Sequence, residues 1–300
     1  MPSVSSLEDA SRLLAAAHAE GRSVRIGGDL TTDGLDRLLE HETGDLTCTV
    51  EAGTRLSVLN EILGRDGQRL SLDPPGDPTV GALLATNVSG PLRHRFGAPR
   101  DLVLGVTLVL ADGTVASAGG KVVKNVAGYD LARLVCGSLG RLALIARASF
   151  RLHPLPKATR TLIVETDDAA RIVALLLRSL LQPSALDVLH PGRVAVLFEG
   201  SERAVEAQLA SARVLVGGER AGAEIWEEAR TRHAESRGRV SFAPGELRRV
   251  LAEVPEAVVR ASAGVAYTRD PTSSGDTAST LGNLIERIRR ELDPRGVFAA

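Results

Sequence analysis

The sequence predicts an α+β protein in two parts, and three observations support this class. The chain has 300 residues, which is more than one typical domain. Helix-like and strand-like runs alternate along it, without the G-x-G-x-x-G fingerprint that marks a nicotinamide-binding parallel sheet. The composition shifts at about Leu155-Pro156-Lys157, where a second series of such runs begins.

Composition and charge argue against one broad class of function. Hydrophobic residues make up 44% of the chain and charged residues 24%, as is ordinary for a soluble globular protein. The formal net charge is -1 and the arginines are spread along the chain, so no basic surface for nucleic acid is indicated. Aromatic residues make up only 3%, which argues against stacking on bases. We therefore expect no nucleic-acid partner.

The two cysteines, Cys48 and Cys136, each lie in an apolar run and lack the spacing of a metal or redox motif. We expect buried free thiols in a reducing compartment. Two cysteines cannot supply the thiolates of an iron-sulfur cluster. The longest apolar run, near Leu102 to Ala111, is too short to cross a membrane, and the charged N-terminal helical pattern is not that of a signal peptide. The sequence therefore predicts a cytoplasmic protein without a transmembrane segment.

Local signals predict the elements of the first half. Ser5 and Glu8 form a capping-box pattern that opens a helix reaching about Glu20. A short strand is expected at Ser23 to Ile26, running into Gly27-Gly28, which is either a phosphate-facing strand end or a plain tight turn. Further expected elements are a strand at Leu46 to Glu51, a helix at Leu56 to Leu63, a helix from Thr79 to Asn87, a hairpin of Leu102 to Leu110 with Val115 to Ser117 turned at Asp112-Gly113, and a helix at Asp130 to Val135.

Two segments have the character of an anion-binding loop. Asp73 to Pro78 contains three prolines, which preset the backbone, and it leads into a helix N-terminus. Ala118 to Gly140 is rich in glycine, so its N–H groups can converge on phosphate oxygens, with Lys121 and Lys124 adding positive charge. Glycine-rich turns before helices are also ordinary architecture, so these residues alone leave both interpretations open.

The order and spacing of these motifs carry a resemblance to a known family. The segments VEAGTRL, DPPGDPTVGALLATNVSG, RFGAPRDLVLGVTLVLADGTV, GGKVVKNVAGYDL and LVCGSLG follow one another within residues 20–155. This set resembles the FAD-binding domain of the vanillyl-alcohol-oxidase type, the PCMH flavoproteins, and within them most resembles the FAD-binding E subunit of glycolate oxidase. The resemblance implies two α+β subdomains with FAD between them.

The same resemblance implies that the chain divides into three parts. Residues 1–155 would form the FAD-binding PCMH-type domain, and residues 156–285 a small α+β cap domain. Residues 286–300 would return to the FAD domain, since ELDPRGVF matches the closing motif of the family. A substrate pocket would then lie where the cap faces the flavin, because domain interfaces are favoured ligand sites.

The resemblance also implies cofactor contacts at matched positions. They are Gly27, Gly28 and Asp29 in the first pyrophosphate loop; Pro75, Gly76, Thr79, Val80, Gly81, Thr86, Asn87 and Gly90 along the flavin and diphosphate; Lys124, Asn125, Gly128, Tyr129 and Asp130 in a second signature; and Gly137, Ser138, Gly140 and Ile145 toward the adenosine half. Neither histidine nor cysteine stands where covalent flavin links arise in the family, so noncovalent FAD is expected. Asp29 replaces a small polar residue and is expected to turn its carboxylate toward phosphate, which would weaken binding.

No catalytic residue and no metal site is predicted. Relatives that oxidise 2-hydroxy acids carry a histidine-rich segment, whereas the six histidines here are isolated and fit surface or capping roles. Trp226 and Arg230 stand at i and i+4 and match an E-subunit pattern. We favour the simpler interpretation of a buried Trp with the Arg stem lying over it.

Two functions follow as hypotheses. The first is an FAD-dependent oxidoreductase subunit of a multi-subunit glycolate or other 2-hydroxy acid oxidase, in which the flavin accepts or relays electrons. It implies a hetero-oligomer with another flavoprotein subunit and an iron-sulfur subunit. The second is a structural subunit of the same fold that binds FAD weakly or not at all.

Overall fold

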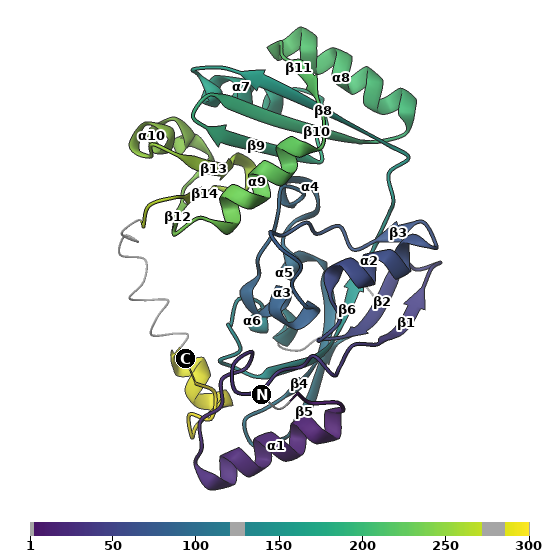
Figure 1. The fold of residues 1–300 in the computed structure, drawn as a ribbon, viewed down its shortest axis with the longest axis vertical. Coiled ribbons are helices and arrows are strands. Elements are labelled where there is room, and N and C mark those ends of the chain that lie inside the picture. Colours follow the sequence, from purple (N-terminus) through teal and green to yellow (C-terminus); the bar gives the residue numbers. More distant parts are fainter. Residues whose placement is uncertain (1–2, 121–129, 272–285, 300) are drawn as a thin grey trace.

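The computed structural model describes residues 3–120, 130–271 and 286–299. These residues form two bodies that are stacked along the long axis in Figure 1. One body contains a five-stranded sheet built from residues 38–151, and the other a seven-stranded sheet built from residues 158–268. The division at residues 155 and 156 remains a prediction of where one domain ends.

The five-stranded sheet is antiparallel between all neighbours, in the order β1-β2-β6-β4-β5. Its strands are β1 (Leu38–Glu42), β2 (Thr47–Glu51), β4 (Val103–Val109), β5 (Val115–Gly119) and β6 (Leu144–Arg151). The predicted hairpin is confirmed, since β4 and β5 pair across a turn in which Gly113 has φ of 85° and the Thr114 amide donates to the Asp112 carboxylate.

Short helices cover this sheet and complete the first body. They are α2 (Leu56–Gly64), α3 (Val80–Thr86), α4 (Arg93–Phe96), α5 (Pro99–Leu102) and α6 (Leu131–Val135), with a small ladder of β3 (Gln68–Arg69) and β7 (His153–Pro154). The predicted helices at 56–63 and 79–87 are confirmed. Leu59, Leu63, Leu83 and Leu84 are fully buried on the sheet, because apolar residues at helical spacing face one side.

Helix α1 (Leu7–Glu20) lies below β4 and β5 in Figure 1. The predicted helix is confirmed, but the predicted cap at Ser5 is wrong. Ser6 is the N-cap, and its hydroxyl accepts the Asp9 amide, while the Ser5 hydroxyl donates to the Asp9 carboxylate. Two adjacent serines are followed by two adjacent acids, so the pattern fits either register and sequence alone could not separate them.

The C-terminal segment packs onto the same N-terminal region, as the chain ends in Figure 1 show. Residues 286–292 are helical, and Phe298 and Val297 are buried with the apolar face of α1. Phe298 forms an isolated parallel bridge with Val24. The strand predicted at Ser23 to Ile26 is therefore wrong, because its partners occur singly rather than as a ladder.

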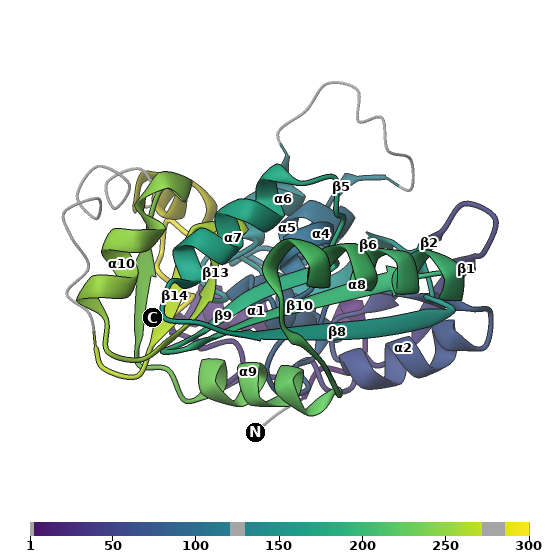
Figure 2. The ribbon, with the colours of Figure 1, turned by 90° about the horizontal axis from the view of Figure 1, so that it is seen from above.

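The seven-stranded sheet is antiparallel between all neighbours, in the order β11-β8-β10-β9-β13-β14-β12. Its strands are β8 (Ala158–Glu165), β9 (Ala185–His190), β10 (Arg193–Gly200), β11 (Glu219–Ala221), β12 (Gly238–Ser241), β13 (Ala257–Arg260) and β14 (Val265–Thr268). Figure 2 shows helices on both faces, namely α7 (Ala169–Arg178), α8 (Glu202–Val216) and α10 (Leu247–Glu253) against α9 (Glu224–Ala234).

Alternation along the strands explains the two covered faces. In β10, Val194 and Val196 point to the cluster that contains α7, α8 and α10, whereas Ala195 points to the cluster that contains α9. A sheet buried on both faces cannot show a clean polar alternation, which is why the sequence marks these strands only as apolar runs. Within the described ranges, no helix is both long and apolar enough to span a bilayer.

Candidate functional site

A cavity of about 340 Å³ opens in the first body, where three segments separated in sequence meet. Its walls are Ile26, Gly27, Thr31, Thr32 and Asp33 from the first loop; Thr79, Gly81, Ala82, Ala85 and Thr86 from α3 and its N-cap; and Leu139, Gly140, Ala143 and Ile145 from the loop before β6 and its start. Six predicted cofactor residues line it, namely Gly27, Thr79, Gly81, Thr86, Gly140 and Ile145. Their contact with a cofactor remains a prediction.

Backbone hydrogen bonds hold the third segment against α3. The Gly137 amide donates to the Leu84 carbonyl at 2.9 Å, and the Leu139 amide donates to the Ala85 carbonyl at 2.8 Å. These carbonyls lie in the last turn of α3, where helix carbonyls lack intrahelical partners. The C-terminal end of α3 therefore holds in place the third segment of the cavity wall.

Glycine allows two close approaches that shape the first loop. A Cβ on Gly53 would lie 2.0 Å from the Thr32 carbonyl oxygen, so the turn after β2 packs directly on the loop backbone. A Cβ on Gly140 would lie 3.0 Å from Ile26 Cβ, so the first and third segments touch beside the cavity. Only residues without a side chain permit these contacts.

Asp29 does not reach the cavity. Its carboxylate accepts the Arg25 amide at 3.0 Å and two guanidinium N–H groups of the same residue at 3.2 and 3.1 Å. These hydrogen bonds from Arg25 lower the pKa of Asp29. The amides of Gly28 and Asp29 themselves donate to the Arg25 carbonyl, so the loop amides that sequence reasoning selected are used within the turn.

Because Asp29 is paired with Arg25 and turned away, Asp29→Asn is expected to leave FAD affinity unchanged. A carboxylate that faced phosphate would behave differently, since its removal would tighten binding. Titration of the apoprotein with FAD, followed by flavin fluorescence, measures the two affinities. Clearly tighter binding by the variant would place the carboxylate at the cofactor after all.

Other predicted residues lie outside the cavity walls. They are Gly28, Asp29, Pro75, Gly76, Val80, Asn87, Gly90, Asp130, Gly137 and Ser138. Gly90 has a packing role, because a Cβ there would lie 1.7 Å from the Asp73 carbonyl oxygen. Asn87 ends α3 with φ of 52°, and its side-chain oxygen accepts the Arg100 amide. Lys124, Asn125, Gly128 and Tyr129 lie outside the described residues.

Sequence reasoning missed part of the cavity wall. Thr31, Thr32 and Asp33 come just after the predicted glycines, and Ala82 and Ala85 project from α3. The spacing of Thr79, Ala82, Ala85 and Thr86 at three to four residues was an available signal, because it places small residues on one helical face.

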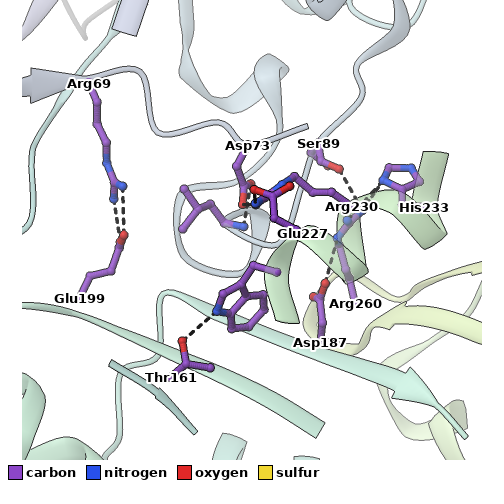
Figure 3. Close-up of polar contacts among 12 residues, drawn as sticks. Arg69, Asp73, Ser89, Thr161, Asp187, Glu199, Glu227, Arg230, His233 and Arg260 are labelled. Atoms are coloured by element: carbon purple, nitrogen blue, oxygen red, sulfur yellow. Dashed lines mark hydrogen bonds and ion pairs between the residues drawn. The ribbon is translucent and has the colours of Figure 1, made fainter. Parts of the chain in front are cut away.

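A second region of interest lies between the two bodies (Figure 3). Arg260 of β13 is 2% exposed, and its Nη1 donates to the Ser89 carbonyl at 2.9 Å. His233 of α9 lies 3.3 Å from both terminal guanidinium nitrogens and stacks on Tyr267 with ring centroids 3.7 Å apart. Burial, and then the charge of Arg260, lowers the pKa of His233 to about 3. This histidine is neutral and buried, so the expectation of a surface or capping role is wrong for it.

Asp187 faces Arg260 from β9 and is completely buried. Its Oδ2 lies 3.7 Å from Arg260 Nε, beyond hydrogen-bond distance, and neither carboxylate oxygen has a hydrogen-bond partner among the described residues. Burial raises the pKa of Asp187 to about 6, against the lowering effect of Arg260. The pair is thus a buried charge contact that connects two strands of the cap sheet.

Asp73 and Arg230 meet at the same junction (Figure 3). Arg230 Nη1 lies 3.6 Å from Asp73 Oδ2, and Asp73 Oδ1 accepts the Leu92 amide at 3.0 Å. Both side chains line two hollows of about 500 and 550 Å³. The buried Trp226 donates to the Thr161 hydroxyl at 2.9 Å. The predicted burial of Trp226 is confirmed, but the Arg230 guanidinium also contacts Asp73 of the other body.

The pKa of Asp73 predicts a pH-dependent contribution to stability. Burial raises this pKa from 3.8 to about 7, and the Leu92 amide and two arginines oppose the shift. Between these values the folded protein holds a proton that the unfolded chain has released, so the contribution of this group falls as the pH rises and is lost above about 7.

Asp73→Asn keeps an oxygen for the Leu92 amide and removes the ionisation. The stability of the variant relative to the wild type is therefore expected to increase as the pH rises from about 4 to about 8, across the window in which Asp73 loses its proton. Urea unfolding of both proteins across this range measures the difference. A constant difference would contradict a raised pKa.

Neither cysteine supplies a reactive thiol. Cys48 is a buried free thiol and Cys136 a half-buried one, and burial raises the pKa of each to about 12. The prediction of free thiols is confirmed. Among the described residues, no group of three histidine, cysteine, aspartate or glutamate side chains has the arrangement of a metal site.

Residues 20–119 match the family described as FAD binding domain. Among curated proteins, the chain is 32% identical over 198 residues to glycolate oxidase subunit GlcE of Escherichia coli, a match that spans 64% of this chain and 55% of that protein. It is 32% identical over 188 residues to glycolate oxidase subunit GlcD of Bacillus subtilis, with 57% and 39% covered. It is 35% identical over 164 residues to a D-lactate dehydrogenase of Archaeoglobus fulgidus, with 53% and 36% covered.

The solved structure of alkyldihydroxyacetonephosphate synthase superposes with a TM-score of 0.73, covering 99% of this chain and 74% of that one. The sequence identity is 16%, so this likeness concerns the fold alone, and it confirms the predicted α+β architecture. The chain spans only 55% of the first of the curated relatives named above, and less of the other two.

Proposed function

We propose that this chain is an FAD-dependent oxidoreductase subunit acting in the oxidation of a 2-hydroxy acid, because residues 20–119 match the family described as FAD binding domain. The observation that carries the proposal is the cavity between the first loop, α3 and the 139–145 segment. Its walls consist of glycine, alanine, threonine and a few aliphatic residues, together with Asp33, and the small residues let a planar or phosphate-bearing group approach the backbone.

The residues present suit such a cofactor. Thr79 and Thr86 contribute hydroxyl groups, and Gly27 and Gly140 lack side chains that would fill the space. A bound flavin supplies two-electron redox chemistry, which the side chains of a protein lack. The chain would bind and orient the cofactor in this cavity, whose lining residues all come from the first body.

The partners belong to the same proposal. Two of the named relatives are called subunits of glycolate oxidase, which favours a hetero-oligomer. The resemblance to the E subunit of glycolate oxidase implies that electrons leave through a separate iron-sulfur subunit, and the 2 cysteines of this chain are consistent with that arrangement. Another flavoprotein subunit would complete the assembly, in the reducing conditions of the cytoplasm.

The test is the behaviour of the purified chain with FAD. We expect a yellow protein whose melting temperature rises with FAD, because a ligand at 100 times its Kd adds about 2.7 kcal/mol of stability. Turnover of glycolate or D-lactate would then be measured with the chain alone and with candidate partner subunits. A colourless protein whose melting temperature ignores FAD would refute the proposal.

The alternative is a structural subunit of the same fold. It is favoured by the first loop, where the amides of Gly28 and Asp29 are used within the turn and not offered to a ligand. In that case the chain would stabilise a partner flavoprotein without carrying FAD. Recovery of the complex from a co-expression, with FAD bound to the partner alone, would support this second function.

A further inference from the structure

An apolar groove lies on the side of the cap body that is turned away from the first body, where α8 is drawn in Figure 1. It has a volume of about 840 Å³ and is formed by α8 and by the turn after α7. The two most exposed large hydrophobic side chains within the described ranges line it, namely Leu180 at 100% and Val214 at 89%. Leu215 of the same wall is 39% exposed. These side chains are therefore available to a partner.

Helix α8 is apolar on two opposite sides. Val205 and Leu209 are buried against the sheet. The acidic residues Glu202 and Glu206 pair with Arg160. The exposed face carries no acidic residue and, apart from one arginine, only small or apolar side chains, namely Arg203, Ala204, Ala207, Ala210, Ser211 and Val214. A surface helix ordinarily turns a polar face to water, and a helix that is apolar all round is ordinarily buried. The pattern therefore indicates that a further element covers α8.

The turn that carries Leu180 is held by hydrogen bonds. The Ser179 hydroxyl accepts the Leu181 amide at 3.1 Å, so the backbone on both sides of Leu180 is fixed. The Gln182 amide donates to the side-chain oxygen of Gln208 at 2.8 Å, which attaches the turn to α8. Because the two walls are held together, a partner would bind here with a smaller loss of conformational entropy.

The charged residues beside the groove are basic. Arg203 stands one turn before Ala207 on the exposed face of α8, Arg213 adjoins Val214, and Arg178 is the last residue of α7. Within the part of the chain that the structure describes, the side chains of these exposed arginines have neither an ion pair nor a hydrogen bond. No acidic residue lines the groove. Complementary charges give an interface its specificity, so the groove fits an apolar surface with acidic residues at its margins.

The walls of the groove favour a helix as the occupant. Ala207, Ala210 and Ser211 are small, and together with Val214 they follow one another at the spacing of a helical stripe. Small side chains let a second helix pack closely, with the two axes about 8 Å apart. Insertion into a lipid surface requires protruding large side chains such as Trp, Phe and Leu, whereas these walls consist mostly of alanine and serine.

A second copy of this chain fits the groove poorly. If two α8 helices packed antiparallel about a two-fold axis at the middle of the stripe, Arg203 of one copy would meet Val214 and the adjacent Arg213 of the other. If they packed parallel, Arg203 would meet its own counterpart. Like charges would face each other in both arrangements, which opposes self-association.

We propose that the groove between α8 and the turn after α7 is the docking site for a helix of the partner flavoprotein subunit, apolar along one face and acidic at its margins. The inference rests on the proposed function, from which it takes the partner. Leu180 and Val214 are the apolar anchors, and Arg178, Arg203 and Arg213 contact the acidic residues of the partner. Docking here leaves the proposed FAD cavity open, since its lining residues all come from the first body.

The test is assembly of the full chain with the subunit of the same organism that resembles GlcD, each purified and then titrated by calorimetry. Val214→Glu should raise the Kd about tenfold or more, because a carboxylate would be buried beside acidic residues of the partner. Arg203→Glu should also weaken the complex, and its effect should shrink at high salt, since salt screens exposed charges. Val58→Glu is the matched control, because Val58 is 45% exposed on α2, in the other body; it should assemble as the wild type does.

The variants should keep the melting temperature and the FAD affinity of the wild type, since the altered side chains are exposed. A wild type that binds FAD but forms no complex would overturn the inference and leave the FAD-dependent function standing. Assembly of Val214→Glu with wild-type affinity would overturn it as well. A chain that assembles as expected but binds no FAD would support the docking site and refute the FAD-dependent function.

Two further measurements look for another occupant of the groove. Sedimentation of the chain alone would detect a dimer, and flotation with phosphatidylglycerol vesicles would detect binding to an anionic lipid surface. We expect a monomer that does not float. A dimer or a vesicle-bound chain that Val214→Glu abolishes would overturn the inference, because the groove would then be covered by a second copy or by lipid.

Discussion

Gly53→Ala is expected to destabilise the protein by about 3 kcal/mol and to weaken FAD binding, because a Cβ at this position overlaps backbone that cannot move freely. The nearest atom would be the Thr32 carbonyl oxygen at 2.0 Å, followed by the Thr32 carbonyl carbon at 2.8 Å and the Leu35 oxygen at 2.9 Å. The Gly53 amide also donates to the Leu35 carbonyl, so the turn after β2 is attached to the loop that it would displace.

The expected loss of stability and the expected loss of FAD affinity have one cause. Thr31, Thr32 and Asp33 form one wall of the cavity, and a shift of Thr32 would move that wall. Urea unfolding measures the stability, and titration with FAD measures the affinity. Gly44→Ala is the matched control, because a Cβ on Gly44, in the turn between β1 and β2, would meet nothing within 4 Å. A Gly53→Ala protein as stable as the control, with full FAD affinity, would contradict this account of the loop.

This contact also shows where sequence reasoning ends. Gly53 belongs to the VEAGTRL segment that supports the family resemblance, yet the pattern does not state what its missing side chain permits. Local signals sufficed for α2, α3 and the β4–β5 hairpin, since helical spacing and the Asp-Gly turn depend on neighbouring residues. The approach of Gly53 to Thr32 depends on two segments 21 residues apart, and no local rule encodes it.

The contacts at the junction between the two bodies were even harder to predict from the sequence. Arg260 and Ser89 are 171 residues apart, and their contact exists only because β13 of the cap sheet lies against the segment after α3. In the sequence, Arg93 is only one of the arginines spread along the chain, and His233 is only one of six isolated histidines. Their chemistry depends on burial and on neighbours that are distant in the sequence, which a single sequence does not reveal.

Six residues of the cavity wall were predicted, because the family resemblance marks them as cofactor contacts. The exact phosphate-facing loop was not, since the Arg25–Asp29 pair turns the predicted carboxylate outward. An i, i+4 pair of opposite charge is visible in the sequence. That spacing predicts a contact only within a helix, and this segment was predicted to be a strand that ends at Ile26 and runs into Gly27-Gly28.

Arg260→Met should be the most destabilising single change at the interface, at about 3 to 5 kcal/mol, because it leaves Asp187 as an uncompensated buried charge. The variant also removes the donor to the Ser89 carbonyl, which lies in the other body. Without Arg260 the pKa of Asp187 should rise above its present value of about 6, since this arginine is the group that lowers it. The destabilisation is therefore expected to grow as the pH rises above about 6, where the wild-type carboxyl is ionised.

A double variant separates the buried charge from the lost contact. Asp187→Leu removes the carboxylate and keeps its branched shape, with methyl groups in place of the two oxygens, and neither carboxylate oxygen gives up a hydrogen bond within the described residues. The double variant, Arg260→Met with Asp187→Leu, should regain much of the stability that Arg260→Met alone loses. Its stability should also lack the pH dependence of Arg260→Met, since no ionisable group remains in the pair. Urea unfolding of the wild type, the two single variants and the double variant at about pH 5 and about pH 8 measures these stabilities. Additive losses in the double variant would show that Asp187 and Arg260 are not energetically coupled, and that the 3.7 Å separation is too long for the pair to act as one.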